Sequence, residues 1–451
     1  MRRLARRLAG PALVLAAASA LGQESPPPAK LHYDMLFEAT LVPTERLARA
    51  RMRIGANQVH RFVFHIDPAR HQNLRGDGSL VVEGRSATWV PPPAGGSLRY
   101  DFRIDHLRDA SAYDARISEQ WAIFRAGDLF PSARVLAVVG STSRSRLRLR
   151  VPKGWSVAVP YKRRADGSYE VVNESRRFAR PTGWMALGRL GVLREKIAGS
   201  SVAIAGPFRQ ELRRQDILAL LRWTLPSLRV LLGELPPRLL VVGAGDPMWR
   251  GGLSGPSSAF VHADRPLITP DGTSPILHEL FHATTGARSV ADGDWVVEGL
   301  AELYSVELLT RSRTMSKRRG ERVLDRIVAR GADTRLQGRD SKGAATARAV
   351  GVLRQLDAEL RARTEQQKNL DDVVAELARK RKGISTASFK ATAERVSGID
   401  LDAFFREKVM PILDRDTSGV TSKQKPAAHS DRHGWRAPTA RPHAAGTGSP
   451  P

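Results

Sequence analysis

The chain has 451 residues, no cysteine, and 72 lysines and arginines against 46 aspartates and glutamates, which gives a formal net charge of +26 at pH 7. This length allows two or three domains with sizeable cores and excludes a small cross-linked scaffold. The lack of cysteine excludes disulfides, a thiolate nucleophile and cysteine-ligated zinc. The arginines are spread along the chain without a nucleic-acid motif. We therefore expect a solvated basic surface, no specific nucleic-acid partner, and nonspecific polyanion adhesion as a side effect.

Residues 1–22 have the pattern of a signal peptide. Basic residues up to Arg7 precede a mostly apolar run from Leu8 to Leu21 that ends in small residues. The run is shorter than the ~20 residues that a membrane-spanning helix needs. We expect cleavage near residue 20 or 22, export to the periplasm or the medium, and no transmembrane segment in the cleaved protein.

Residues 23–205 show the alternation that is typical of β-strands. Leu98, Tyr100 and Phe102, for example, alternate with polar residues. Stretches rich in proline and glycine, such as residues 91–96, separate the alternating runs. This part of the chain is therefore predicted to be an N-terminal antiparallel β domain that resembles a sandwich.

Residues 206–312 change to a mixed pattern. Leucines recur at helical intervals up to Pro226, and residues 239–242 have the composition of a buried strand. A short strand is expected at Ser258–His262. We predict a mixed α/β catalytic subdomain here, because the motif described next lies within it.

A short helix is predicted between Ser274 and Gly286. Ser274 is a good N-cap, Pro275 suits the first helical position, and Gly286 is a typical helix end. The helix carries the sequence HELFH at residues 278–282. Its two histidines are one turn apart, about 6 Å along the axis, so both rings can reach one metal ion.

The HELFH sequence has the chemistry of a zinc hydrolase. Zinc accepts imidazole nitrogen and, in catalytic sites, usually has three protein ligands and an open position. His278 and His282 are the predicted ligands. Glu279 can reach a water molecule whose pKa the metal lowers to about 7, and can act as its general base.

A second helix is predicted from Asp294, as its cap, to about Leu309. Glu298 and Glu302 lie one turn apart on one face of it. Glu298 can supply the third zinc ligand, while Glu302 can accept the other ring N–H of a ligating histidine. On spacing alone, either glutamate could be the ligand.

The remaining residues divide into a helical part and a tail. Residues 313–413 carry apolar stripes at helical spacing and are predicted to form an α-helical domain that closes one wall of the cleft. Residues 414–451 are rich in small, polar and charged residues. We expect a disordered tail there.

The sequence WVVEGLAE at residues 295–302, together with HELFH, resembles the gluzincins related to aminopeptidase N and the glycyl aminopeptidases. Weaker similarity to the glycyl aminopeptidases extends over most of residues 30–413, including residues 349–361 and the edge-strand segment 251–262. The resemblance implies a thermolysin-like zinc subdomain, one zinc ion per chain, and peptide or protein substrates. It also favours Glu298 as the ligand, with a shortened loop after His282.

Two departures from these relatives concern the site. Their oxyanion-binding tyrosine is replaced in the segment Thr346-Ala347-Arg348-Ala349. Thr346, Arg348 and Tyr304 are the candidates to take its place. Ser254 stands where relatives that trim amino termini have a glutamate for the substrate amine, and it is, with Gly252, a candidate substrate contact.

Three functions therefore compete. The first is an exported zinc metallopeptidase, acting as an exopeptidase or an endopeptidase. The second is a zinc-binding homologue with little turnover that binds peptides. The third, a polyanion-adhesive surface protein, leaves Glu279 without a role.

Overall fold

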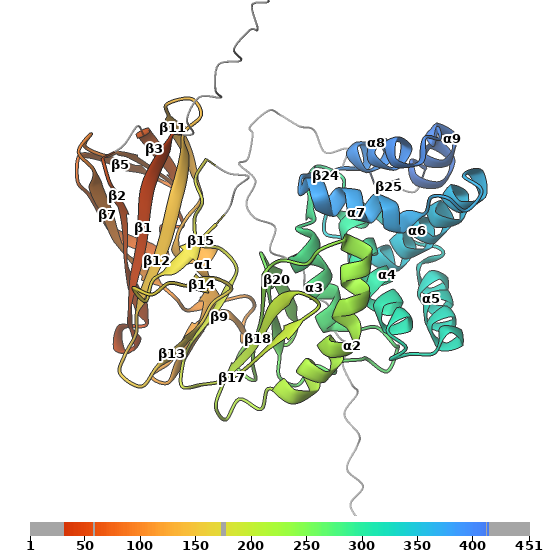
Figure 1. Cartoon of the computed structure of the whole chain (residues 1–451), viewed down its shortest axis with the longest axis horizontal. Helices are drawn as coiled ribbons and strands as arrows, with labels where there is room; N and C mark the ends of the chain where they lie inside the picture. Colours follow the sequence, from red (N-terminus) through yellow and green to blue (C-terminus); the bar gives the residue numbers. More distant parts are fainter. Residues whose placement is uncertain (1–30, 57–58, 173–176, 412, 415–451) are drawn as a thin grey trace, which may run out of the picture.

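The computed structural model describes residues 31–56, 59–172, 177–411 and 413–414. A β-rich half and a helical half lie side by side (Figure 1), so the chain is a mixed α+β protein with several sheets. The predicted signal peptide and residues 415–451 of the predicted tail lie outside the described residues. Within the described ranges, no helix is both long enough and apolar enough to cross a membrane.

Three sheets in the β-rich half pack around one apolar core, in which large aromatic side chains such as Phe37, Phe62 and Phe102 are fully buried. The seven-stranded sheet has the order β14 (Lys162–Arg163), β15 (Tyr169–Val171), β12 (Thr142–Arg150), β1 (His32–Val42), β2 (Leu47–Ile54), β7 (Gly96–Arg103) and β4 (His71–Gly76). The five-stranded sheet has the order β13 (Ser156–Ala158), β16 (Trp184–Gly188), β10 (Trp121–Arg125), β9 (Tyr113–Ile117) and β8 (His106–Leu107). The four-stranded sheet has the order β11 (Ala133–Ala137), β3 (Val59–His65), β6 (Ser86–Val90) and β5 (Ser79–Glu83).

The sequence predicted an antiparallel β domain, but the seven-stranded sheet contains both parallel and antiparallel pairs. β1 pairs antiparallel with β2 but parallel with β12, which begins about 100 residues later in the chain. An alternating pattern places side chains on the two faces of a strand, but it does not report the direction of the neighbouring strand. The alternating pattern therefore predicted that strands form here, but it could not predict which strands pair or in which direction.

The next sheet begins before the predicted change of pattern at residue 206. Its order is β17 (Leu190–Ile197), β18 (Ser200–Pro207), β19 (Arg238–Ala244), β21 (Ser258–His262) and β20 (Gly252–Gly255). The hairpin β17–β18 begins before residue 206, where the catalytic subdomain was predicted to start, and its alternation continues that of the earlier strands. β20 pairs antiparallel with β21 and lies at the edge of this sheet.

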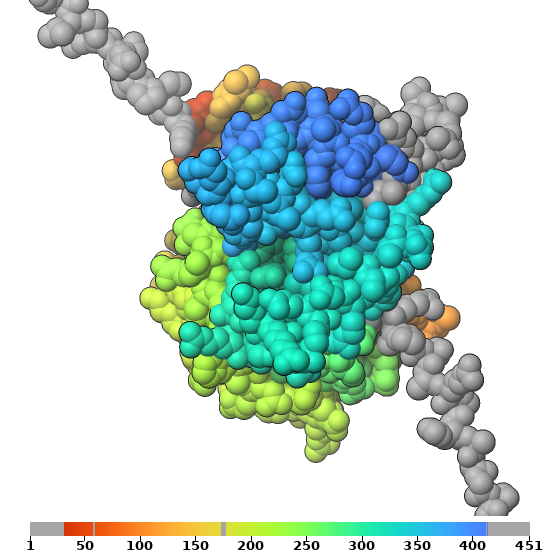
Figure 2. All heavy atoms as spheres, turned by 90° about the vertical axis from the view of Figure 1, so that its right-hand side faces the viewer, coloured from red at the N-terminus to blue at the C-terminus, as the bar shows by residue number. Residues whose placement is uncertain are grey.

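The helical half consists mainly of α2 (Arg214–Leu232), α3 (Pro275–Thr285), α4 (Asp294–Arg311), α5 (Lys317–Gly331), α6 (Ala344–Arg363), α7 (Leu370–Lys380), α8 (Thr386–Ser397) and α9 (Asp402–Phe404). Short strands pair β22 (Arg288–Ser289) with β24 (Gly383–Ile384), and β23 (Leu336–Gln337) with β25 (Leu413–Asp414). Figure 2 shows the helical side of the molecule, which the later helices largely form. α2 continues past Pro226, where the pattern predicted its end, because Leu228 and Leu231 remain buried in the core.

Candidate metal centre

The helix α3 forms as its sequence predicts. The Ser274 hydroxyl accepts a hydrogen bond from the Leu277 N–H, Pro275 is the first helical residue, and Gly286 ends the helix with a φ of +65°. Ile276, Leu277, Leu280 and Phe281 are buried in the core. The opposite side of the helix therefore faces α4 and the sheet edge with His278, Glu279 and His282.

The helix α4 brings its glutamates to the same place. Its N-terminus is fixed by the Trp295 indole N–H, which donates to Thr386 Oγ1 at 2.9 Å. Gly299 permits close packing, because a Cβ there would lie 2.7 Å from the Cβ of Ala349 on α6. Asp294 was predicted to cap α4, but it is the first residue of the helix. Its carboxylate accepts a hydrogen bond from the Ser341 N–H at 2.7 Å.

His278, His282 and Glu298 come together as three donors. The Nε2 atoms of the two histidines lie 3.2 Å apart. The carboxylate oxygens of Glu298 lie 3.3 Å from His278 Nε2 and 3.4 Å from His282 Nε2. Ligands about 2.0–2.1 Å from a tetrahedral zinc ion are separated by about 3.3–3.4 Å. The three donors therefore have the separations that a zinc ion requires. Two imidazoles and a carboxylate are also ligands that zinc accepts.

Glu302 occupies a different position from Glu298. Its carboxylate lies 3.4 Å from Nδ1 of His278, the ring nitrogen that faces away from Glu298. Burial alone would lower the pKa of His278, but the hydrogen bonds to Glu298 and Glu302 raise it well above the usual value. A metal ion at this ring must therefore replace a proton.

Glu279 lies against the edge strand of the sheet. Its side chain is 6% exposed and borders the same cavity as His278 and Glu298. A Cβ at Gly252 of β20 would lie 2.7 Å from Cγ and 3.0 Å from Oε1 of Glu279. Gly252 thus leaves the space that the Glu279 carboxylate occupies.

The cavity contains residues that the sequence did not indicate. Gly252, His278, Glu279, Glu298, Glu302 and Thr346 are the predicted residues that line it. The others are Arg265, Thr269, Thr273, Pro275, Ser341 and Lys342. Burial lowers the pKa of Arg265, and the charge of Glu279 opposes that shift, so the two side chains lie close enough to interact. Apart from Pro275, the first residue of α3, these additional residues come from loops before α3 and α6, where no local pattern marks them.

Four predicted site residues do not line this cavity. One is His282, whose Nε2 nevertheless belongs to the three donors described above. Ser254 lies farther along β20, and Arg348 lies beyond the first turn of α6. Tyr304 is 1% exposed, and its ring stacks on Phe281. The structure therefore does not bring Tyr304 to the place of an oxyanion donor, contrary to one of the alternatives considered above.

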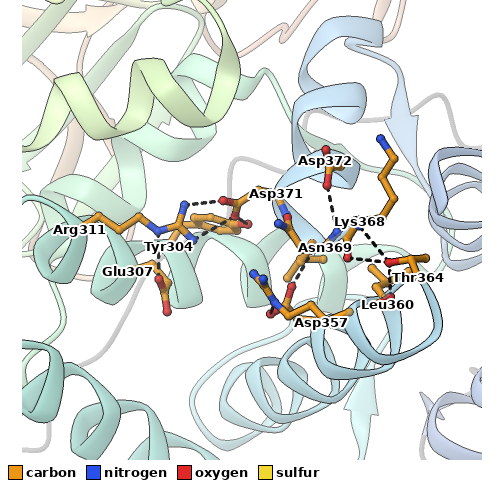
Figure 3. Close-up of polar contacts among 12 residues, drawn as sticks. Tyr304, Glu307, Arg311, Asp357, Leu360, Thr364, Lys368, Asn369, Asp371 and Asp372 are labelled. Carbon is orange, nitrogen blue, oxygen red and sulfur yellow. Dashed lines mark hydrogen bonds and ion pairs between the residues drawn. The ribbon is translucent and has the colours of Figure 1, made fainter. Parts of the chain in front are cut away.

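Tyr304 instead connects α4 to α7. Its hydroxyl donates to Asp371 Oδ1 at 2.6 Å, and the Arg311 guanidinium donates to both oxygens of Asp371 at 2.7 and 3.0 Å. Figure 3 shows both side chains pointing to this carboxylate. Burial and the charge of Asp371 raise the pKa of Tyr304 well above its usual value, so the phenol remains protonated. These contacts hold the helix that carries Glu298 and Glu302.

Comparisons by sequence give no relative: no family model and no curated protein matches the chain. Solved structures do match it. An aminopeptidase N family protein from Idiomarina loihiensis superposes with a TM-score of 0.61 at 16% identity, over 83% of this chain and 76% of that protein. The M1 zinc metallopeptidase of Deinococcus radiodurans superposes with a TM-score of 0.53 at 14% identity, over 84% and 93%.

A third match is the aminopeptidase A of Legionella pneumophila in complex with aspartic acid, with a TM-score of 0.56 at 12% identity over 84% of this chain and 49% of that protein. At these identities, the matches show a shared fold. They confirm the structural likeness to relatives of aminopeptidase N that the sequence indicated.

Proposed function

We propose that this chain is a zinc-dependent metallopeptidase, a function that its structural similarity to M1 zinc metallopeptidases supports. The single observation that carries the proposal is the triangle of donors at 3.2–3.4 Å formed by His278, His282 and Glu298. They would hold one zinc ion per chain. Glu302 would orient the His278 ring through Nδ1.

The roles of the other residues follow from their positions. Zinc, when bound, supplies a Lewis acid that lowers the pKa of water to about 7. Glu279 would take the proton from the attacking water and return it to the departing amine. Thr346 lines this cavity and belongs to the segment in which the tyrosine of the relatives is replaced. Its Oγ1 lies 3.4 Å from Ser341 Oγ. It would donate to the developing oxyanion.

The cavity's remaining charges indicate which peptides fit. Besides Glu279, Glu298 and Glu302, whose roles are given above, the cavity wall carries Lys342 and Arg265, which also interacts with Glu279. Positive charge favours a substrate carboxylate near the cleaved bond over a free amine. The pattern of residues 1–22 supports the further proposal that the protein is exported and meets extracellular or periplasmic peptides.

The test is metal analysis of the purified protein beside cleavage of a peptide library with free or blocked termini. We expect one zinc per chain, and cleavage that a chelator abolishes and zinc restores. Zinc without cleavage would favour the alternative, a homologue that binds peptides without hydrolysing them. No zinc after incubation with excess metal would contradict both functions.

Gly252→Ala is expected to lower kcat while zinc content stays the same. The added methyl group would lie 2.7 Å from Cγ of Glu279, so the carboxylate must move, and a misplaced catalytic group can cost about 10²-fold in rate. Gly55→Ala is the matched control, because a Cβ at Gly55 meets no atom within 4 Å. Equal activity of the two variants would show that the position of Glu279 does not depend on Gly252.

Tyr304→Phe is expected to lower stability and leave kcat nearly unchanged. The variant loses a hydrogen bond to the charged Asp371, a type of bond that contributes about 1.5–3 kcal/mol. Urea unfolding measures the first effect and steady-state kinetics the second. Loss of an oxyanion donor would instead lower kcat by about 10²–10³-fold. A decrease of that size would show that Tyr304 acts in the active site.

A further inference from the structure

One face of the seven-stranded sheet collects arginines that are dispersed in the sequence. On β2 the side chains at alternate positions are Arg49, Arg51 and Arg53, between the buried Ala48, Ala50, Met52 and Ile54. On β12, Arg144, Arg146, Arg148 and Arg150 alternate in the same way. Because side chains alternate between the faces of a strand, each set lies on the face away from the core.

The strand register sets arginines directly opposite one another. Arg51 on β2 faces Arg99 on β7, and Arg99 in turn faces Arg75 on β4. Neighbouring strands are about 4.8 Å apart, and like charges directly opposite each other are destabilising. An anion that contacts two of these guanidinium groups would remove this repulsion. The row therefore favours an anionic ligand with several charges.

This face is hollowed, and arginines line the hollow. They are the three arginines of β2 together with Arg75, Arg99, Arg148 and Arg150. Two carboxylates, Glu38 and Asp101, line it as well, so the seven arginines leave a formal surplus of five positive charges. The hollow lies on the β-rich half, in which β2 and β7 are far from α4 and the metal centre (Figure 1).

Carboxylates near the hollow neutralise only part of this charge. Glu45 contacts Arg49 at 2.8 Å, and Asp166 lies 3.9 Å from Arg148. Asp77 is close to Arg51 and Arg99, but it accepts its hydrogen bonds from the N–H and hydroxyl of Ser97. Among the described residues, no carboxylate lies within 4 Å of the guanidinium groups of Arg53, Arg75 or Arg99. Arg53, Arg75 and Arg99 can therefore contact an anionic ligand.

The shape and chemistry of the hollow restrict that ligand. Guanidinium groups bind carboxylates and phosphates through two parallel hydrogen bonds. Of the described residues that line it, only Tyr100 is aromatic, and Tyr100 is 3% exposed with its hydroxyl bonded to the Leu129 carbonyl. A single-stranded nucleic acid would lack the stacking contacts that it uses. A flat bilayer would meet the rim of a hollow and not its floor.

We propose that this arginine-lined hollow binds a linear acidic polysaccharide. The repeated charges of such a polymer match the arginines on β12, β2, β7 and β4. Binding there would hold the protein on an acidic polymer and leave the metal centre, in the other half, accessible. This proposal does not depend on the function proposed for that centre.

The test compares two triple variants of the full-length protein that lose the same charge. One carries Arg51→Gln, Arg75→Gln and Arg99→Gln in the hollow. The control carries Arg318→Gln, Arg319→Gln and Arg322→Gln on the exposed face of α5. Kd is measured by fluorescence anisotropy for labelled polygalacturonate, with poly(dT) and vesicles of phosphatidylcholine and phosphatidylglycerol as the other probes.

We expect the hollow variant to bind polygalacturonate about tenfold more weakly, as the loss of three surface ion pairs implies, and the control variant to change little. Equal weakening in both would show a nonspecific effect of net charge and overturn the proposal. Tighter binding of poly(dT) or vesicles than of polygalacturonate, lost in the hollow variant, would overturn the choice of ligand. If the glutamine variant does not fold, the corresponding lysine triple, which keeps the charge but loses the paired hydrogen bonds, should still weaken binding; unchanged binding would contradict the proposal.

Discussion

Glu279→Gln is expected to abolish peptide hydrolysis and leave zinc content unchanged. Glutamine keeps the shape of the side chain but cannot take a proton, and general-base catalysis contributes about 10²–10⁴-fold to such rates. Zinc should remain, because the three donors that meet at the metal centre are His278, His282 and Glu298. Steady-state cleavage of the best library peptide measures the first effect, and elemental analysis measures the second.

The control for this substitution is Glu321→Gln, which makes the same change at an exposed position of α5. It should behave as the parent protein in both measurements. Full cleavage by Glu279→Gln would assign the proton transfer to another group. Peptide binding that is equal in the parent and Glu279→Gln, with no cleavage by either, would instead identify a binding protein.

Glu298→Ala is expected to reduce zinc affinity far more than Glu302→Ala. The first substitution removes one of three donors that lie 3.2–3.4 Å from one another. The second removes only the carboxylate 3.4 Å from His278 Nδ1, and a loss of this kind typically costs about 10–100-fold in affinity. Competition with a chromophoric chelator gives both dissociation constants.

Circular dichroism of the two metal-free variants separates loss of the ligand from loss of the fold. Each variant also leaves the His278 ring with one carboxylate fewer, so both should lose some stability in similar measure. The reverse order of zinc affinities would make Glu302 the ligand. Because Glu302 lies one turn after Glu298, that outcome would require α4 to shift by about 6 Å along its axis, which should be visible in a crystal structure of the zinc-loaded protein.

Local patterns predicted the parts of the site that lie within single helices. The ends of α3 follow from Ser274 and Gly286, whose effects act within one turn. Glu298 and Glu302 share a face because four residues make about one helical turn. Tyr304 is six residues after Glu298, about 240° around the helix, so its distance from the cavity could also have been predicted from the same geometry.

Contacts between distant segments could not be predicted in this way. Asp371 binds Tyr304 from 67 residues away, and Ser341 meets Asp294 from 47 residues away. Arg265 and Lys342 enter the cavity from loops that have no periodic pattern. The arginine row on β2, β7 and β4 depends on a strand register that no local alternation specifies.

The edge position of β20 has a consequence for how a substrate would be selected. The His262 N–H donates to the Gly251 carbonyl, so in this antiparallel pair Gly252 and Ser254 turn their own N–H and C=O groups away from β21. Among the strands that the structure describes, β20 is outermost in its sheet, and an extended peptide can pair with such an edge through its main chain. Pairing of this kind selects a peptide by its extended main-chain conformation more than by its side chains. Flexible tails and unfolded stretches would then be accepted, while helices and compact surfaces would be refused whatever their sequence.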